Sequence, residues 1–156
     1  MSESGQMTQE RFELDGMTWQ DVADTFELME DWEDRYRFVI ELGRKLPALP
    51  DGAYSDANKV RGCQSQVWMI SDLTDTVPRR LHILGDSDAH IVKGLVALLL
   101  LLYSDRTPDE IEAIDARARF KALDLEGHLS SQRANGLLAM IDHIRSLAHT
   151  QQAAGA

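Results

Sequence analysis

The chain has only one cysteine and no excess of positive charge. A single thiol cannot form an internal disulfide, and it cannot build a thiolate zinc site alone. Acidic residues outnumber Lys and Arg by 26 to 16, and the net charge of −10 argues against nucleic-acid partners and anionic membrane surfaces. The longest apolar run, Leu95–Tyr103, is too short to span a bilayer, which takes about 20 residues.

The remaining bulk properties are typical of one globular domain. The 156 residues are 44% hydrophobic and 27% charged, which is ordinary for a chain long enough to bury a core. Residues 1–6 carry neither a basic n-region nor an apolar h-region, so no secretory signal is expected. With one free thiol and no export signal, we expect a reducing, cytoplasmic location.

Hydrophobic spacing predicts a single α+β domain over residues 17–149, between a disordered leader (1–16) and a flexible tail (150–156). Capping patterns at Thr18 and Thr107 predict two helix starts, and Ser87 is expected to cap a central helix. The expected helices are 18–29, 31–46, 88–102, 108–114, 117–123 and a last one from 130 or 131. Strand-like segments at 59–62, 66–73 and 79–84 predict a small three-stranded antiparallel sheet, on which the helices pack.

The lone Cys63 lies in the most informative stretch of the chain, residues 58–68. The preceding Gly62 indicates a tight turn, which places the sulfur on a loop between the first two expected strands. Lys59 and Arg61 bring positive charge within a few residues, which favours the thiolate. A small, buried and inert cysteine stays open as the alternative, because free cysteine is among the most buried residue types.

The other candidate sites have simpler structural explanations. The five histidines do not occur at metal-ligand spacing, and only His90 is placed where it could approach Cys63. The acidic residues between 21 and 34 form a helical surface rather than a catalytic pair. No phosphate-binding loop, dinucleotide fingerprint or pyridoxal-phosphate lysine is recognisable. We therefore expect no metal and no cofactor.

Four segments, taken in order, carry a resemblance to a known family. They are residues 35–47, with Arg-Tyr and a closing Leu-Pro; 62–68, Gly-Cys-Gln-Ser-Gln-Val-Trp; 85–95, Gly-Asp-Ser-Asp before Ile-Val-Lys-Gly-Leu; and 128–137, His-Leu-Ser, then Arg and Gly-Leu. Together they resemble the SufE/CsdE family, the sulfur-acceptor proteins of iron–sulfur cluster assembly. The resemblance covers about Trp19 to Leu147.

The resemblance implies a SufE-like fold and a sulfur carrier rather than a free-standing enzyme. Cys63 would take persulfide sulfur from a pyridoxal-phosphate cysteine desulfurase similar to SufS or CsdA, stimulate that enzyme, and pass the sulfur to an iron–sulfur scaffold similar to the SufB complex. The residues implied to support the loop or bind a partner are Arg61, Gly62, Gln64, Ser65, Gln66 and Arg133. A thiol redox sensor and a cluster scaffold are the competing functions, and whether the chain forms a homodimer stays open.

A carrier also needs to protect its persulfide from passing thiols. We therefore expect Cys63 to rest turned inward, beneath the helix that contains Ile91–Leu102, and to swing out when a partner docks. Burial would raise the pKa of the Cys63 thiol, whereas Lys59 or Arg61 would lower it. The sequence alone does not give the sign of the net change.

Overall fold

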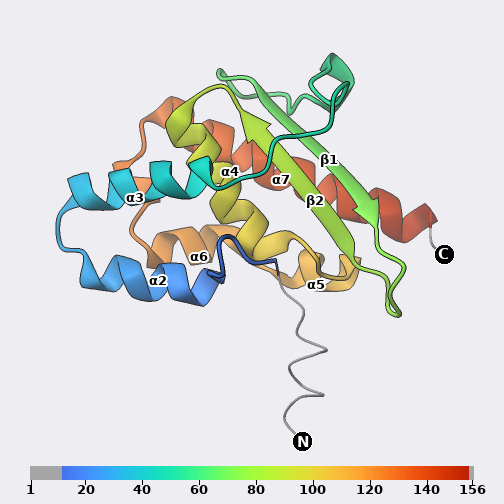
Figure 1. The fold of residues 1–156 in the computed structure, drawn as a ribbon, viewed down its shortest axis with the longest axis horizontal. Helices are drawn as coiled ribbons and strands as arrows, with labels where there is room; N and C mark the ends of the chain where they lie inside the picture. The colour runs from blue at the N-terminus through green and yellow to red at the C-terminus, as the bar shows by residue number, and fades with distance from the viewer. Residues whose placement is uncertain (1–11, 155–156) are drawn as a thin grey trace, which may run out of the picture.

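The centre of the fold is the helix α4, which runs from His90 to Tyr103. The computed structural model describes residues 12–154, which contain six α-helices and one antiparallel pair of strands. Nearly all of α4 is buried, and α3, β2, α7 and α2 pack against it (Figure 1). The long apolar run of the sequence thus forms the middle of the core, as an all-round apolar helix requires. The expectation of a single α+β domain is confirmed.

The helices α2 (Trp19–Leu28) and α3 (Trp32–Arg44) begin where their capping residues predict. Thr18 and Asp21 form a reciprocal capping box at the start of α2, and the carboxylate of Asp31 accepts from the Glu33 amide at the start of α3. Arg35 joins the two helices, because its guanidinium donates to the carbonyls of Met29 and Phe26, at 2.8 Å each. Two carbonyls at the C-terminal end of α2 are thereby paired.

Two glycines let α3 lie close to α4. A Cβ at Gly43 would come within 2.7 Å of the Gly94 nitrogen, and a Cβ at Gly94 would collide with Val39. Neither helix can therefore carry a larger residue at this crossing without moving apart. The close packing fixes the start of α4 relative to the rest of the domain. Val92 and Leu95 lie in this part of α4.

The sheet has two strands, β1 (Val67–Leu73) and β2 (Leu81–Ser87), paired antiparallel with Ile70 opposite Leu84. The expected third strand is wrong: residues 59–62 form only an isolated bridge, Lys59 with Trp68, within the described part of the chain. The short helix η1 (Asp56–Asn58) ends just before the bridge, and Gly62 leaves the extended conformation just after it. Too few extended residues remain between them to continue the ladder.

The start of α4 also differs from the sequence expectation. The strand β2 continues through Ser87, so the helix begins at His90 instead of Asp88, and its N-cap is Ala89. The hydroxyl of Ser87 still serves this turn, because it accepts from the Ala89 amide at 3.2 Å. Asp88, expected as the first helical residue, is left in the connection with its side chain available for another role.

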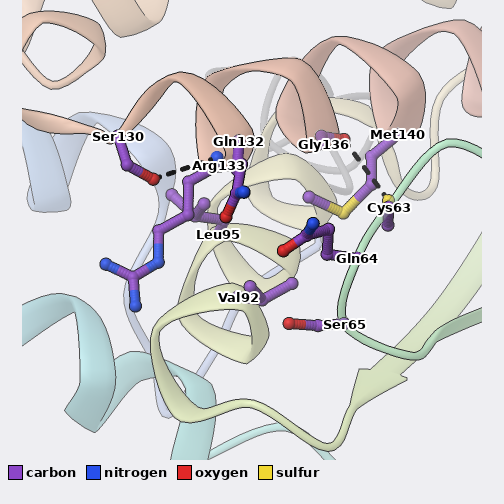
Figure 2. Close-up of a pocket in the computed structure, with 10 residues that line it drawn as sticks. All are labelled: Cys63, Gln64, Ser65, Val92, Leu95, Ser130, Gln132, Arg133, Gly136 and Met140. Carbon is purple, nitrogen blue, oxygen red and sulfur yellow. Dashed lines mark hydrogen bonds between the residues drawn. The ribbon is translucent and has the colours of Figure 1, made fainter.

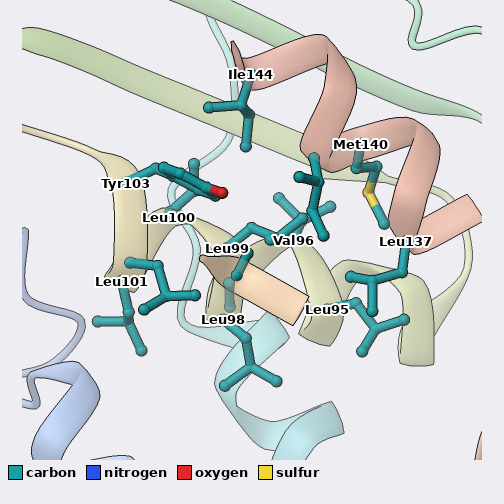
Figure 3. Close-up of a cluster of buried hydrophobic side chains, with 14 of the residues drawn as sticks. Leu95, Val96, Leu98, Leu99, Leu100, Leu101, Tyr103, Leu137, Met140 and Ile144 are labelled. Atoms are coloured by element: carbon teal, nitrogen blue, oxygen red, sulfur yellow. The ribbon is translucent and has the colours of Figure 1, made fainter. Parts of the chain in front are cut away.

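The C-terminal half closes the core from the other side. The helices α5 (Pro108–Ala113) and α6 (Ala116–Ala122) are short, the 3-10 turn η2 (Glu126–His128) follows, and α7 runs from Ser131 to Ala154. The capping box of Thr107 and Glu110 opens α5 as expected. Figure 3 shows Leu137, Met140 and Ile144 of α7 facing the leucines of α4. These contacts hold α7 along the central helix.

Both expected chain ends need correction where the structure describes them. Phe12 and Leu14, placed by sequence in a disordered leader, are buried at 9% and 3% exposure, and Leu14 pairs with Met17 in a bridge. The last helix α7 extends to Ala154, into the expected flexible tail. The rest of the leader, residues 1–11, and residues 155–156 lie outside the described residues. No helix within the described range is long and apolar enough to cross a membrane.

Candidate functional site

The loop that carries Cys63 turns at Gly62, which has a φ of +92°. L-amino acids with a side chain rarely adopt this conformation. A Cβ at this position would also meet the Cβ of Ala139 on α7 at 3.1 Å, which is tighter than an ordinary contact. The position requires a positive φ and little space for a side chain, and glycine satisfies both requirements. The turn directs the next residue toward α7.

The thiol of Cys63 is half-buried against α7, where it donates to the carbonyl oxygen of Gly136 at 3.6 Å (Figure 2). A Cβ at Gly136 would lie 3.7 Å from the sulfur, so this helix position is lined by backbone rather than by a side chain. A carbonyl oxygen accepts from a thiol but repels a thiolate. The resting geometry therefore suits the protonated sulfur.

Burial raises the pKa of the Cys63 thiol above its ordinary value of 9.0, and desolvation is the cause. The nearby cations do not offset it: Lys59 pairs with Asp56 at 3.5 Å, and Arg61 is exposed. The net change in the pKa of Cys63, whose direction the sequence left open, is therefore upward. In the resting state the sulfur is mainly a thiol at neutral pH.

A pocket of about 360 Å³ opens beside the sulfur, between the Cys63 loop, α4 and the start of α7. Its lining residues are Cys63, Gln64, Ser65, Val92, Leu95, Ser130, Gln132, Arg133, Gly136 and Met140. The apolar members come from the facing sides of α4 and α7, and the polar ones come from the loop and the first turn of α7. A nucleophile thus lines a cavity large enough for a small molecule or a partner side chain.

The C-terminal end of the loop is clamped to the start of α4. The carboxylate of Asp88 accepts from the backbone amide and from the side-chain amide of Gln66, at 3.1 Å each. In return the Asp88 amide donates to the Gln66 carbonyl at 3.3 Å. On the other side, the Val60 amide donates to the Val67 carbonyl at 2.8 Å. Both ends of the Cys63 loop are therefore fixed, while its tip extends to α7.

A polar network centred on the buried Asp86 stands behind this clamp. The carboxylate of Asp86, only 8% exposed, accepts from the Tyr54 hydroxyl at 2.6 Å and from the Ser87 amide at 2.8 Å, and pairs with Lys93 at 3.2 Å. The hydrogen bond to Asp86 raises the pKa of Tyr54. The Tyr54 ring packs edge-on against Trp68, with ring centroids 5.0 Å apart. The long loop after α3 is thus attached to the strand that follows Cys63.

The sequence-predicted site residues fall into two groups. Gln64, Ser65 and Arg133 line the pocket together with Cys63. Arg61, Gly62 and Gln66 do not line it: Arg61 is exposed, Gly62 makes the turn, and Gln66 binds Asp88. The Arg133 amide is bonded to the Ser130 hydroxyl at 3.2 Å, and its guanidinium points away from the sulfur (Figure 2).

Several contributors were not predicted as site residues from sequence: the Gly136 carbonyl, the Asp88 clamp, and the side chains of Ser130, Gln132 and Met140. Two signals were available for Gly136: it belongs to the segment 128–137 that carries the family resemblance, and a glycine inside a helical pattern often marks a packing or functional position. His90, the histidine that could have approached Cys63, is exposed and does not line the pocket. Across residues 12–154, no three His, Cys, Asp or Glu side chains are grouped to hold a metal ion.

Comparison with known proteins shows what the chain as a whole is similar to. A family model described as "SufE: Fe-S metabolism associated domain" matches residues 20–148. A SufE-like protein of Rhizobium meliloti (strain 1021) is 49% identical over 126 residues, which cover 80% of this chain and 90% of that protein. A SufE-like protein of Rhizobium etli is 47% identical over 134 residues, which cover 85% of this chain and 90% of that protein.

The fold also matches a solved structure. The solution structure of a hypothetical protein from Thermus thermophilus aligns with a TM-score of 0.68 and 18% sequence identity, and covers 86% of this chain and 97% of that one. At this identity the likeness establishes the arrangement of helices and strands, and it carries no statement about chemistry.

Proposed function

Because the chain belongs to the SufE family of Fe–S metabolism associated domains, we propose that Cys63 accepts and carries sulfur for iron–sulfur cluster assembly. The observation that supports this most strongly is the position of the sulfur. The lone thiol of the chain lies at the tip of a glycine-turned loop and lines a pocket. An inert core cysteine would need neither the turn nor the pocket.

The proposed donor is a pyridoxal-phosphate cysteine desulfurase similar to SufS or CsdA, which presents a cysteine persulfide. The Cys63 thiolate attacks the outer sulfur, a new S–S bond forms on Cys63, and the original S–S bond breaks. The desulfurase cysteine leaves as a thiolate, and no electrons are gained or lost overall. The chain acts as a partner that raises desulfurase turnover, not as an enzyme in its own right.

The resting geometry calls for a movement before this reaction. Inside the pocket the sulfur is desolvated and bonded to the Gly136 carbonyl, so it is a poor nucleophile there. Docking of the desulfurase supplies the energy to turn the loop outward about Gly62. When the loop returns inward with a persulfide on Cys63, the pocket shields the outer sulfur from other thiols.

The polar residues around the loop are the proposed contacts for this exchange. Gln64 and Ser65 offer neutral donors beside the sulfur, Gln66 holds the end of the loop, and Arg61 and Arg133 are exposed cations that face a docking partner. The proposed acceptor of the sulfur is an iron–sulfur scaffold similar to the SufB complex. A reducing, cytoplasmic setting fits a carrier whose only thiol must stay free.

The test is mass spectrometry of the intact chain after incubation with a candidate desulfurase and cysteine. Loading should add the mass of one or more sulfur atoms at Cys63, and the adduct should be removed by a reductant. A chain that gains no sulfur but is oxidised by peroxide would instead indicate a thiol redox sensor. The raised pKa of Cys63 argues against that function, because sensor cysteines have low pKa values.

A further inference from the structure

The pocket beside Cys63 differs in charge from the rest of the molecule. The chain as a whole has 26 acidic residues against 16 Lys and Arg. Among the residues that line the pocket, however, there is no carboxylate, and Arg133 is the single charged side chain. An acidic protein thus places one cation and no carboxylate around the cavity at its nucleophile, which favours an anionic ligand.

The Arg133 guanidinium is available for such a ligand. Within the described residues Arg133 hydrogen-bonds through its backbone amide, and its side chain is exposed. Figure 2 shows the guanidinium at the opposite side of the pocket from the sulfur, with Val92 and Leu95 between them. A planar guanidinium forms strong paired hydrogen bonds with a carboxylate.

The geometry points to a second sulfur donor: we propose that the pocket binds a small peptide persulfide, with Arg133 on its carboxylate and its outer sulfur at Cys63. This rests on the proposed ability of Cys63 to carry a persulfide. It adds a route of loading that needs no desulfurase. A di- or tripeptide fits better than a single amino acid, because the cation and the sulfur lie on opposite sides of a cavity of about 360 Å³.

The reaction balances without a further reagent. The Cys63 thiolate attacks the outer sulfur of the peptide persulfide, the peptide S–S bond breaks, and the peptide leaves as its thiolate. The outer sulfur keeps its proton and its oxidation level. Because burial raises the pKa of Cys63, the rate should rise with pH.

The experiment compares glutathione persulfide, which carries two carboxylates, with the persulfide of 2-mercaptoethanol, which carries none. Each is mixed with the full chain, and sulfur on Cys63 is followed by mass spectrometry. Intrinsic reactivity is corrected by the same two reactions with a short peptide of residues 58–68. The corrected rate constant should be about tenfold larger for glutathione persulfide, the effect of one charge-assisted hydrogen bond, and should saturate with its concentration.

Arg133→Gln should bring the corrected ratio of the two rate constants close to one, and Arg133→Lys should keep part of the preference. Arg79→Gln is the matched control, because it removes the same charge from the exposed hairpin at the far end of the sheet from Cys63. Circular dichroism checks that each variant is folded. A native chain without preference, or a preference that survives in Arg133→Gln, overturns the proposal. Loading by a desulfurase is measured in parallel, so failure here is distinguishable from failure of the carrier function.

Discussion

The carbonyl oxygen of Gly136 lies 3.6 Å from the sulfur of Cys63, although the two residues are 73 positions apart in the chain. The contact joins the tip of a loop to the start of α7, and the turn at Gly62 brings the sulfur there. Its chemical consequence is a resting thiol that donates a hydrogen bond and is hindered from ionising.

The first prediction concerns the ionisation of Cys63. Because burial raises its pKa, the rate of alkylation by iodoacetamide should reach half its maximum at a pH above 9.0 in the native chain. In urea the midpoint should return to the ordinary value. Adding an inactive desulfurase should lower the midpoint and speed the reaction. A native thiol that reacts as fast as free cysteine, with no change on adding the partner, would exclude the shielded loop.

The raised pKa of Cys63 also makes the stability of the fold depend on pH. A thiol whose pKa is raised in the folded state binds its proton more tightly there than in the unfolded chain. Its contribution is fully present below pH 9.0, the ordinary value, and is lost as the pH rises through the folded pKa. Cys63→Ser should remove this part of the pH dependence of the unfolding free energy. Urea titrations at neutral pH and at pH values above 9.0 can measure the change.

The second prediction is that Cys63→Ser keeps the fold and loses all sulfur acceptance. Serine preserves the shape of the side chain but is a far weaker nucleophile at neutral pH. Mass spectrometry should find the sulfur adduct on the native chain and none on the variant. Stimulation of a desulfurase should be lost as well, and a variant that still stimulates it fully would contradict the carrier mechanism.

Much of the fold could be predicted because its signals are local. The capping boxes at Thr18 and Thr107 depend on side chains three residues apart, and both helix starts are confirmed. The buried central helix was visible as an unbroken apolar run. Membership of the SufE family rested on ordered sequence blocks, and the comparisons confirm it.

The features that sequence missed depend on contacts between distant segments. Residues 59–62 have strand character, but pairing beyond one bridge fails because of the turn at Gly62. Phe12 and Leu14 lack a periodic pattern, yet they pack into the core. The pocket joins one loop to two helices, so its walls and the sign of the Cys63 pKa change needed the assembled structure.

The third prediction tests the turn at Gly62. Gly62→Ala places a side chain at positive φ and 3.1 Å from the Cβ of Ala139. Gly52→Ala is the matched control, since Gly52 has a φ of +88° with no atom near its would-be Cβ. The control should lose about 1–2 kcal/mol from backbone strain, and Gly62→Ala roughly 1 kcal/mol more from the added contact. Equal losses in urea unfolding would show that the contact with α7 is unimportant.

The fourth prediction concerns the network behind the loop. Tyr54→Phe removes the hydroxyl that donates to Asp86 and accepts from the Leu49 amide at 3.0 Å, while the ring can still pack against Trp68. The variant should lose about 1–3 kcal/mol of unfolding free energy, because a largely buried carboxylate and a backbone amide each lose a partner. Tyr36→Phe, whose hydroxyl makes one exposed bond to the His128 carbonyl, is the control and should lose less.

The fifth prediction is that the Asp88 clamp limits how often the Cys63 loop opens. Asp88→Ala removes both acceptors that hold Gln66, and Gln66→Ala removes the side-chain bond alone. If the clamp restrains the loop, alkylation of Cys63 should be about tenfold faster in Asp88→Ala and less accelerated in Gln66→Ala, in line with the loss of hydrogen bonds to a charged group. Asp75→Ala, in the exposed turn between β1 and β2, removes the same charge and should leave the rate unchanged. Rates that are equal in all three variants and the native chain would mean that the loop opens without releasing Asp88. In that case its movement is confined to the tip, between Gly62 and Ser65, and the Gly136 contact alone restrains it.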